Sequence, residues 1–487
     1  MSKMNRELLF KYSTQILASF AFFIIAFFLF RDYRLGDDTY IYIQYAKHII
    51  HNGEISFNLG ERSYGFTSPL WLGLITFLSY VTSSPLIAPE LLSMFFSLLT
   101  VFVWYFIFLE LQFDLKKTIV GLVIIILDPN LLKHSFLGME ASISYFLSSF
   151  QIILLLKYIK GSKQILLFSV VSSIYFLIRP ESVLVSIFLF VFLWKEKKVI
   201  LSDLFYVLIV GSIIVLPWHI FAYNYFGSLF PSTFGAKGGS YIWGEKFLEH
   251  FSDSVIIFLG NYFIYLFIVL LFFINKQKGI KIESTINLFK VFMGIVILLV
   301  TFYSFSLNRE LVYARYYCIV FPFINFIFLS FLLKTERKSY YILTIITLFA
   351  ISTVQSIMTQ RSFVENENSE LIAINWINKI ANPNDVIVRG RIGKIGYLTD
   401  RKILDPVGLI NPEIIAYYRN NIISQYYLKY KPKYFIGDST QLRVALNKNV
   451  KYKIMASIEH KSQRLIRSFI APKSIHNECI YELDWNK

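Results

Sequence analysis

The chain of 487 residues contains only two cysteines and few charged residues for its length, and each shortage excludes a class of protein. Cys318 and Cys479 are far apart, so the sequence supports neither a disulfide framework nor a zinc site. Charged residues make up 16% of the chain, whereas hydrophobic residues make up 55% and aromatic residues 18%. With a mean hydropathy of +0.54, a soluble globular protein of this size would not stay in solution. The composition predicts a polytopic α-helical membrane protein.

The sequence also lacks an internal repeat, a low-complexity tract and a signal-peptide cleavage site. The first apolar run, Ile16 to Phe30, ends in Arg31-Asp32-Tyr33 and not in small residues. This ending predicts a retained membrane anchor.

The net charge of +16 would by itself suit a nucleic-acid partner. The basic residues, however, form short clusters between apolar runs, which is the positive-inside pattern of membrane proteins. The clusters are Lys3/Arg6/Lys11, Lys116/Lys117, Lys157/Lys160/Lys163, Lys195/Lys197/Lys198, Lys276/Lys278/Lys281 and Lys334/Arg337/Lys338. We therefore expect a lipid bilayer, and no nucleic acid, as a partner.

If these clusters are cytoplasmic, the spans between them come in pairs, and about eleven spans satisfy that parity. The expected spans are 12–30, 87–109, 118–128, 141–156, 165–178, 182–194, 199–217, 253–274, 288–305, 315–333 and 340–357. Parity also makes Pro69 to Val81 a half-length segment in the outer interface. The prediction is a multi-pass protein of the cytoplasmic (inner) membrane with its N-terminus inside.

The hydropathy falls from Gln360 onward, and helix and strand signals alternate. Leu371 to Ile380 has helical spacing and Asn382 to Asp385 reads as a turn. Short strands are expected at Val386–Val388, Lys402–Leu404, Tyr434–Ile436, Lys453–Met455 and Cys479–Tyr481. The expected domains are a transmembrane catalytic domain, 1–359, with its first outer loop at 31–86, and an extracytoplasmic α/β domain, 360–487.

Two adjacent carboxylates, Asp37 and Asp38, follow the first apolar run directly. Carboxylates are costly at a bilayer surface unless they face water, a cation or a polar substrate, so the pair indicates an active site at the membrane surface. A solvated loop, or an N-cap for a helix starting at Thr39, remains the alternative.

Other charged residues fall on the same outer side. Arg179-Pro180-Glu181 joins two spans of about 14 residues, too short to cross the membrane alone, and predicts a cavity open to the outside. Glu140 either begins a helix or binds substrate. Lys237 either binds a phosphate or snorkels to the surface. Arg315 either binds a phosphate or takes part in an ion pair among Arg309, Glu310 and Arg315.

Seven motifs in order resemble those of the GT-C membrane glycosyltransferases, and within them the mycobacterial terminal β-arabinofuranosyltransferases. The motifs are Asp-Asp-x-x-Ile-x-x-x-Tyr-Ala at 37–46, Phe57-Asn-x-Gly-Glu-Arg62, Gly65-Phe-Thr-Ser-Pro-Leu-Trp71, Gly138-Met-Glu140, Arg179-Pro-Glu181, Gly227-Ser-x-x-Pro231 with Ala236-Lys237, and Gly393-x-Ile-Gly-Tyr397 with Asp405-x-x-Gly-Leu409. The resemblance implies a GT-C fold, a lipid-phosphate-linked sugar donor, an outward active site and an acidic catalytic residue in the first outer loop. Ser63-Tyr64 replaces an expected Val-Glu pair, which leaves the sugar and acceptor open.

The residues together predict a transferase that moves a sugar from a polyprenyl-phosphate donor to a cell-envelope glycan acceptor. Asp37 is the expected base; Asp38 orients it, hydrogen-bonds the sugar or holds a divalent cation, which leaves a metal cofactor open. The expected substrate-binding residues are Tyr45, Glu61, Arg62, Trp71, Glu140, Arg179, Glu181, Lys237 and Arg315, of which Lys237, Arg179 and Arg315 are candidates for the phosphate. A transporter or flippase of a lipid-linked saccharide, or a glycan polymerase or ligase, is the alternative.

Overall fold

The computed structural model describes residues 3–30, 35–238, 247–274, 283–306, 314–334, 337–446, 450–458 and 478–485. The chain forms two compact units. The first contains residues 1–32, 90–218 and 243–356, and the second contains residues 33–89, 219–242 and 357–487. The segment expected as the first outer loop thus belongs to the same unit as the C-terminal region.

Among its described residues, the first unit contains helices joined by loops and no strand. Its elements are α1 (Lys3–Phe30), α4 (Ile87–Glu110), α5 (Leu115–Ile126), α6 (Pro129–His134), α7 (Ala141–Ile159), α8 (Ile165–Ile178), α9 (Ser182–Lys195), most of α10 (Leu201–Phe226), α12 (Phe247–Ile274), α13 (Glu283–Ser306), the 3₁₀ helix η1 (Ala314–Ile319), α14 (Phe321–Leu332) and the first half of α15 (Lys338–Ile380). Each of the eleven expected spans overlaps helix in this unit, and the span expected at 315–333 is divided between η1 and α14. Among the described residues, six helices are long and apolar enough to cross a membrane.

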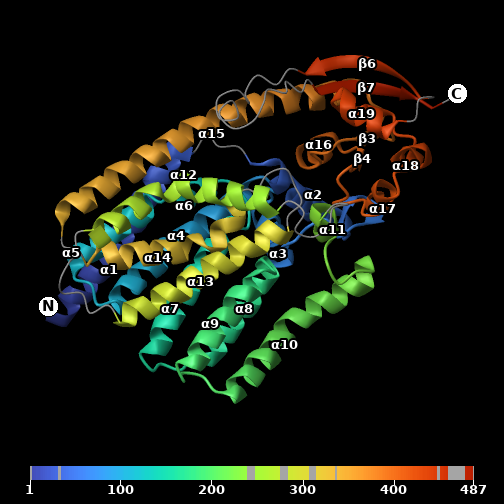
Figure 1. The fold of residues 1–487 in the computed structure, drawn as a ribbon. Coiled ribbons are helices and arrows are strands. Elements are labelled where there is room, and N and C mark those ends of the chain that lie inside the picture. The colour runs from blue at the N-terminus through green and yellow to red at the C-terminus, as the bar shows by residue number, and fades with distance from the viewer. Residues whose placement is uncertain are drawn as a thin grey trace. The chain divides into compact units, whose positions relative to one another are not determined.

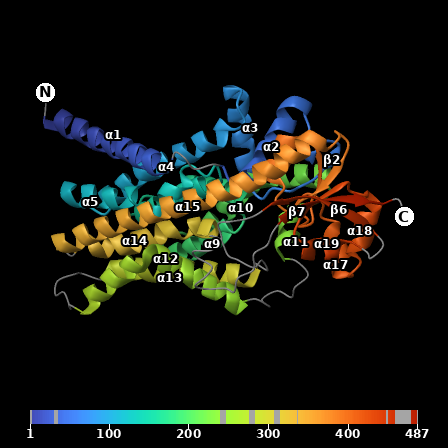
Figure 2. The same ribbon diagram turned by 90° about the horizontal axis from the view of Figure 1, so that it is seen from above.

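These helices pack side by side (Figures 1 and 2), with α7 against α8, α8 against α9, and α13 against α9, α12 and α14. A buried polar centre joins four of them. Asp128 caps α6 and accepts the N–H groups of Asn130 and Leu131, the Tyr262 hydroxyl of α12 and the Asn325 amide of α14. The same amide donates to Tyr145 of α7. Because each buried oxygen of Asp128 has donors, the carboxylate is tolerated inside an apolar bundle.

The second unit combines the segment after α1 with the C-terminal region. Its elements are α2 (Asp37–Asn52), β1 (Ser56–Asn58), β2 (Glu61–Arg62), α3 (Pro69–Thr82), the last turns of α10, α11 (Ser232–Gly238), the end of α15, β3 (Val386–Val388), α16 (Gly393–Thr399), β4 (Lys402–Leu404), α17 (Ile414–Arg419), α18 (Ile423–Tyr430), β5 (Tyr434–Gly437), α19 (Ser439–Ala445), β6 (Lys451–Ile458) and β7 (Glu478–Asp484). All five strands predicted in the C-terminal region are confirmed, as is the turn at 382–385.

Those five strands form one mixed sheet in the order β4-β3-β5-β7-β6. β3 is parallel to β4 and β5, whereas β7 is antiparallel to β5 and β6. Apolar side chains from the sheet, such as Leu404 and Phe435, pack against Ile414 of α17 and Tyr426 and Tyr427 of α18. The parallel strands all end toward the loop that leads into α16, where ligand sites of α/β sheets are commonly found.

The segment after α1 packs on this sheet through specific polar and apolar contacts. Asn58, at the end of β1, donates to the backbone oxygen of Ile403 at 2.9 Å and accepts the Ile403 N–H at 3.0 Å. The ring of Phe57 lies so close to Gly396 of α16 that a β-carbon there would be 2.5 Å from it. Asn58 thus substitutes for a neighbouring strand at the edge of β4.

Replacing Asn58 with Ala should lower the thermal unfolding temperature of the purified protein. The variant leaves a buried N–H and C=O of Ile403 without partners, which costs about 1–3 kcal/mol. Asn378→Ala is the control, because Asn378 is exposed and donates one bond to Leu398 at 3.2 Å. Equal unfolding temperatures for the two variants would contradict the role of Asn58.

Candidate active site

Asp37 and Asp38 are the first two residues of α2, which therefore begins two residues before the expected Thr39. The N-cap is Gly36 and makes no side-chain bond to the helix, so neither carboxylate acts as the cap. Both side chains are partly exposed to solvent. The helix ends where Gly53 adopts a left-handed conformation with φ +67°.

The carboxylate of Asp37 is held by two backbone N–H groups at the start of α16. Gly393 donates to Oδ2 at 3.2 Å and Lys394 donates to Oδ1 at 2.8 Å. The two backbones approach so closely that a β-carbon on Gly393 would lie 1.8 Å from the carbonyl oxygen of Asp37. A carboxylate has about four acceptor positions, so two bonds leave room for a substrate proton.

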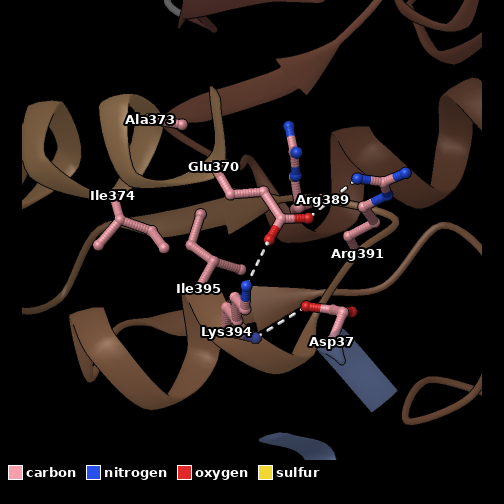
Figure 3. Close-up of a pocket in the computed structure, with 8 residues that line it drawn as sticks. All are labelled: Asp37, Glu370, Ala373, Ile374, Arg389, Arg391, Lys394 and Ile395. Carbon is pink, nitrogen blue, oxygen red and sulfur yellow. Dashed lines mark hydrogen bonds and ion pairs between the residues drawn. The ribbon is translucent and has the colours of Figure 1, made fainter. Parts of the chain in front are cut away.

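Three cations and a second carboxylate line the small pocket beside Asp37 (Figure 3). Glu370, near the end of α15, pairs with Arg391 at 3.0 Å and with Lys394 at 3.4 Å. Arg389, which follows β3, is buried in the same wall. All of these groups belong to the second unit.

Burial is the largest cause that raises the pKa of Asp37 from 3.8 to about 6, and the negative charge of Glu370 is the next. Asp38 adds to the increase, while the N–H groups of Lys394 and Gly393 oppose it. A carboxylate with this pKa is largely ionised at neutral pH and binds a proton more readily than an ordinary aspartate. Such a group is suited to act as a general base.

Four further residues expected in the site lie on α2, β2 and α3, and they differ in how exposed they are to solvent. Tyr45 and Trp71 have no exposed surface. The Tyr45 hydroxyl donates to the backbone oxygen of Ser63 at 2.9 Å and accepts the Gly65 N–H at 3.1 Å, which fixes the loop. In this conformation neither side chain has surface that a substrate could touch.

Glu61 and Arg62 lie on β2 and are accessible. Glu61 forms an ion pair with Lys402 and accepts a bond from Asn58 at 3.0 Å. The guanidinium of Arg62 lies 4.5 Å from the ring centre of Tyr225, a cation–π distance. Both side chains thus contact other residues of the second unit and remain partly exposed to solvent.

The other expected charges meet in the first unit. Arg179, at the junction of α8 and α9, pairs with Glu140 at 3.1 Å and with Glu181 at 2.8 Å. Tyr303 also donates to Glu181 at 2.8 Å. Both terminal nitrogens of the buried Arg179 are thus engaged by carboxylates. Exchanging such a partner for a ligand would uncover a buried charge.

Arg315 and Lys237 are the two remaining candidates for the phosphate. The backbone oxygen of Arg315 accepts a bond from Arg179 at 3.5 Å, and its guanidinium lies 5.5 Å from the ring centre of Tyr316. Lys237 belongs to α11, but its side chain lies outside the described residues. Arg309 and Glu310 lie outside them too.

A cavity of about 600 Å³ lies between α8, α9 and α10. Its wall is apolar apart from Ser172, Ser173, Ser186 and Ser212, with Gly211 at one side. The junction of the short spans α8 and α9 was expected to lie beside a cavity open to the outside. The lining of the cavity described here suits a hydrocarbon chain.

Among the residues that the structure describes, no group of three or more His, Cys, Asp or Glu side chains is arranged to hold a metal ion. Near Asp37, the second carboxylate is Glu370, and its two oxygens face Arg391 and Lys394.

Sequence reasoning did not identify Glu370, Arg389, Arg391 or Lys394 as site residues. The cluster Arg389-Gly-Arg391-Ile-Gly-Lys394 directly follows a predicted strand, a signal that could have indicated a site at the end of the sheet. Glu370 carried no such signal, because nothing in its helix distinguishes it from other acidic residues.

Two solved structures share the fold over nearly the whole chain. A crystal structure of ArnT from Cupriavidus metallidurans bound to undecaprenyl phosphate covers 96% of this chain and 97% of its own, with a TM-score of 0.62 and 9% sequence identity. A structure of the same protein in the apo state covers 99% and 98%, with a TM-score of 0.63 and 9% identity. The chain has this GT-C fold.

The sequence comparisons are narrower. A family model described as "Domain of unknown function (DUF8728)" matches residues 358–479, the part of the chain that supplies Glu370 and the 389–394 loop. No curated protein matches the sequence.

Gly393→Ala should destabilise the second unit and separate α16 from α2. The added carbon would meet backbone at 1.8 Å, and backbone cannot rotate away as a side chain can. Gly390→Ala is the matched control, because its added carbon would have ordinary contacts at 3.8 and 3.9 Å. We expect a lower unfolding temperature for Gly393→Ala alone; a similar decrease in both variants would contradict the close approach.

Proposed function

We propose that this protein is a membrane glycosyltransferase that moves a sugar from a polyprenyl-phosphate donor to a hydroxyl group of a cell-envelope glycan. The observation that carries the proposal is the state of the Asp37 carboxylate. It is partly exposed, two backbone N–H groups hold it, and its pKa is raised to about 6. The similarity in fold to ArnT, whose crystal structure contains undecaprenyl phosphate, supports a lipid-phosphate donor.

The reaction needs one proton acceptor and one stabilised leaving group. The acceptor oxygen forms a bond to the anomeric carbon, while the bond from that carbon to the phosphate oxygen breaks and its electron pair leaves with the phosphate. The hydroxyl proton passes to Asp37, which raises the nucleophilicity of the oxygen as the sugar develops oxocarbenium character. Asp38 follows on the same helix turn and orients the base or binds the sugar.

The cations proposed for the leaving phosphate are Lys237 and Arg315. Arg179 was a third candidate, but its two terminal nitrogens already bind Glu140 and Glu181. A positively charged group near the phosphate stabilises the charge that builds up as the bond breaks.

The donor also requires an apolar path for its polyprenyl chain. The cavity between α8, α9 and α10 is apolar and of suitable size, and many apolar side chains of α10, such as Ile209 and Ile213, are exposed on that helix. We propose an inner-membrane location with the catalytic face outside, because nucleotide sugars are cytosolic and an outward site needs a donor delivered on lipid. The sugar is a pentose, such as arabinofuranose, or a hexose, and the resemblance leaves both open.

Asp37→Asn should fold and insert normally but lose transfer by about a hundred- to ten-thousandfold, because the amide cannot accept the proton. The measurement is sugar release from a purified polyprenyl-phosphate sugar by the purified protein in the presence of an acceptor glycan. Asp38→Asn is the comparison and should retain more activity. Full activity in Asp37→Asn would show that Asp37 is not the base. If the wild type released no sugar from the donor, the result would favour a transporter.

The pH dependence of wild-type kcat/KM should have an acid limb with a midpoint near the pKa of Asp37, about 6. The base works only when ionised, so activity is present above this pH and is lost as the pH falls through it. A midpoint near 3.8, the ordinary value, would show that a different or unperturbed carboxylate limits the reaction.

A further inference from the structure

Glu370 is a nearly buried carboxylate with 8% of its surface exposed, and it lines the same small pocket as the candidate base. Its Oε1 pairs with Arg391 at 3.0 Å, and its Oε2 pairs with Lys394 at 3.4 Å. A carboxylate buried to this extent needs compensating cations, and both come from the loop after β3.

Lys394 joins the two carboxylates. Its ammonium group binds Glu370, and its backbone N–H binds Asp37 Oδ1 at 2.8 Å (Figure 3). The neighbouring Gly393 supplies the second N–H, and it has no room for a side chain. Lys394 therefore connects Glu370, through its side chain, to the backbone donors that hold Asp37.

We propose that the region at 358–479 completes the catalytic site, and that Glu370 is its positioning residue, holding Lys394 and through it the N–H groups that fix Asp37. This inference rests on the proposed function of Asp37 as the base. Glu370 does not contact the reacting atoms. It sets where Asp37 points and how strongly Asp37 binds a proton, and so gives a catalytic role to a region described only as a domain of unknown function.

The charge of Glu370 has a definite effect on Asp37. The charged groups that line the pocket around Asp37 are Glu370 from α15 and Arg389, Arg391 and Lys394 from the loop into α16, with Asp38 on its own helix. Glu370 and Asp38 oppose ionisation of Asp37, whereas the cations favour it. Removing the charge of Glu370 removes a negative charge that raises the pKa of Asp37. It also takes a carboxylate partner away from Arg391 and Lys394, and their positive charges lower that pKa further. Both effects make Asp37 a weaker base.

The test is the pH dependence of kcat/KM in Glu370→Gln, measured on the full-length purified protein with a polyprenyl-phosphate sugar donor. We expect the acid limb to move to lower pH by on the order of one unit. At pH 5 the variant should then keep about half of its own plateau rate, where the wild type keeps about a tenth. The plateau itself should fall, because the N–H donors are less well fixed.

Two variants separate positioning from simple structural damage. Glu370→Asp keeps the charge and should leave the acid limb near its wild-type midpoint. Glu413→Gln is the matched control, since it makes the same change on an exposed glutamate that accepts a bond from Tyr430 at 3.0 Å, and it should change neither the limb nor the plateau.

Lys394→Met covers the case in which Glu370→Gln does not fold. It keeps the N–H bond to Asp37 but leaves Glu370 less neutralised, so the acid limb should move to higher pH. An unshifted limb in folded Glu370→Gln or Lys394→Met, together with an inactive Asp37→Asn, would overturn this inference and leave the proposed function standing. An active Asp37→Asn would instead remove the proposed base.

Discussion

Two backbone N–H groups, from Gly393 and Lys394, hold the carboxylate of Asp37, and the rest of the candidate site depends on that contact. The contact needs backbone-to-backbone approach between α2 and α16, which only a glycine at 393 allows. It also needs the sheet that places α16, and the docking of Asn58 on Ile403 that fixes the preceding segment. A single aspartate at the start of a helix thus acquires a defined orientation from structure more than 350 residues away in the sequence.

The two charged clusters of the protein differ in how their charges are compensated. Around Arg179, two carboxylates bind the terminal nitrogens of one guanidinium inside the helical unit, and the Tyr303 hydroxyl donates to one of those carboxylates. Around Asp37, the donors are neutral N–H groups, and the cations pair with Glu370 instead. An ionisable group that is oriented but not neutralised keeps its capacity to exchange a proton. This difference, more than the presence of charge, separates a candidate base from a structural ion pair.

The motif Gly393-x-Ile-Gly-Tyr397 shows how a sequence pattern and a packing constraint coincide. Both glycines lie where another segment of the second unit approaches closely, Gly393 against Asp37 and Gly396 against Phe57. Lys394, between the two glycines, donates its backbone N–H to Asp37. Tyr397, after the second glycine, packs its ring against Tyr40. The pattern was visible in the sequence, but its partner segments were not, because nothing local indicates which chain segment a glycine will face.

The sequence by itself predicted the apolar helices, five strands and the candidate carboxylates. Hydrophobic runs of span length, positive clusters between them and short β-branched strands are local patterns; every predicted span overlaps described helices, and all five predicted strands are present. Tertiary structure alone decided that residues 33–89 pack with the C-terminal region, that Tyr45 and Trp71 are buried, and that Glu370 and Lys394 adjoin Asp37. The physical reason is distance along the chain: local patterns set backbone conformation, whereas burial, ion pairing and the pKa of a carboxylate depend on neighbours that folding brings together.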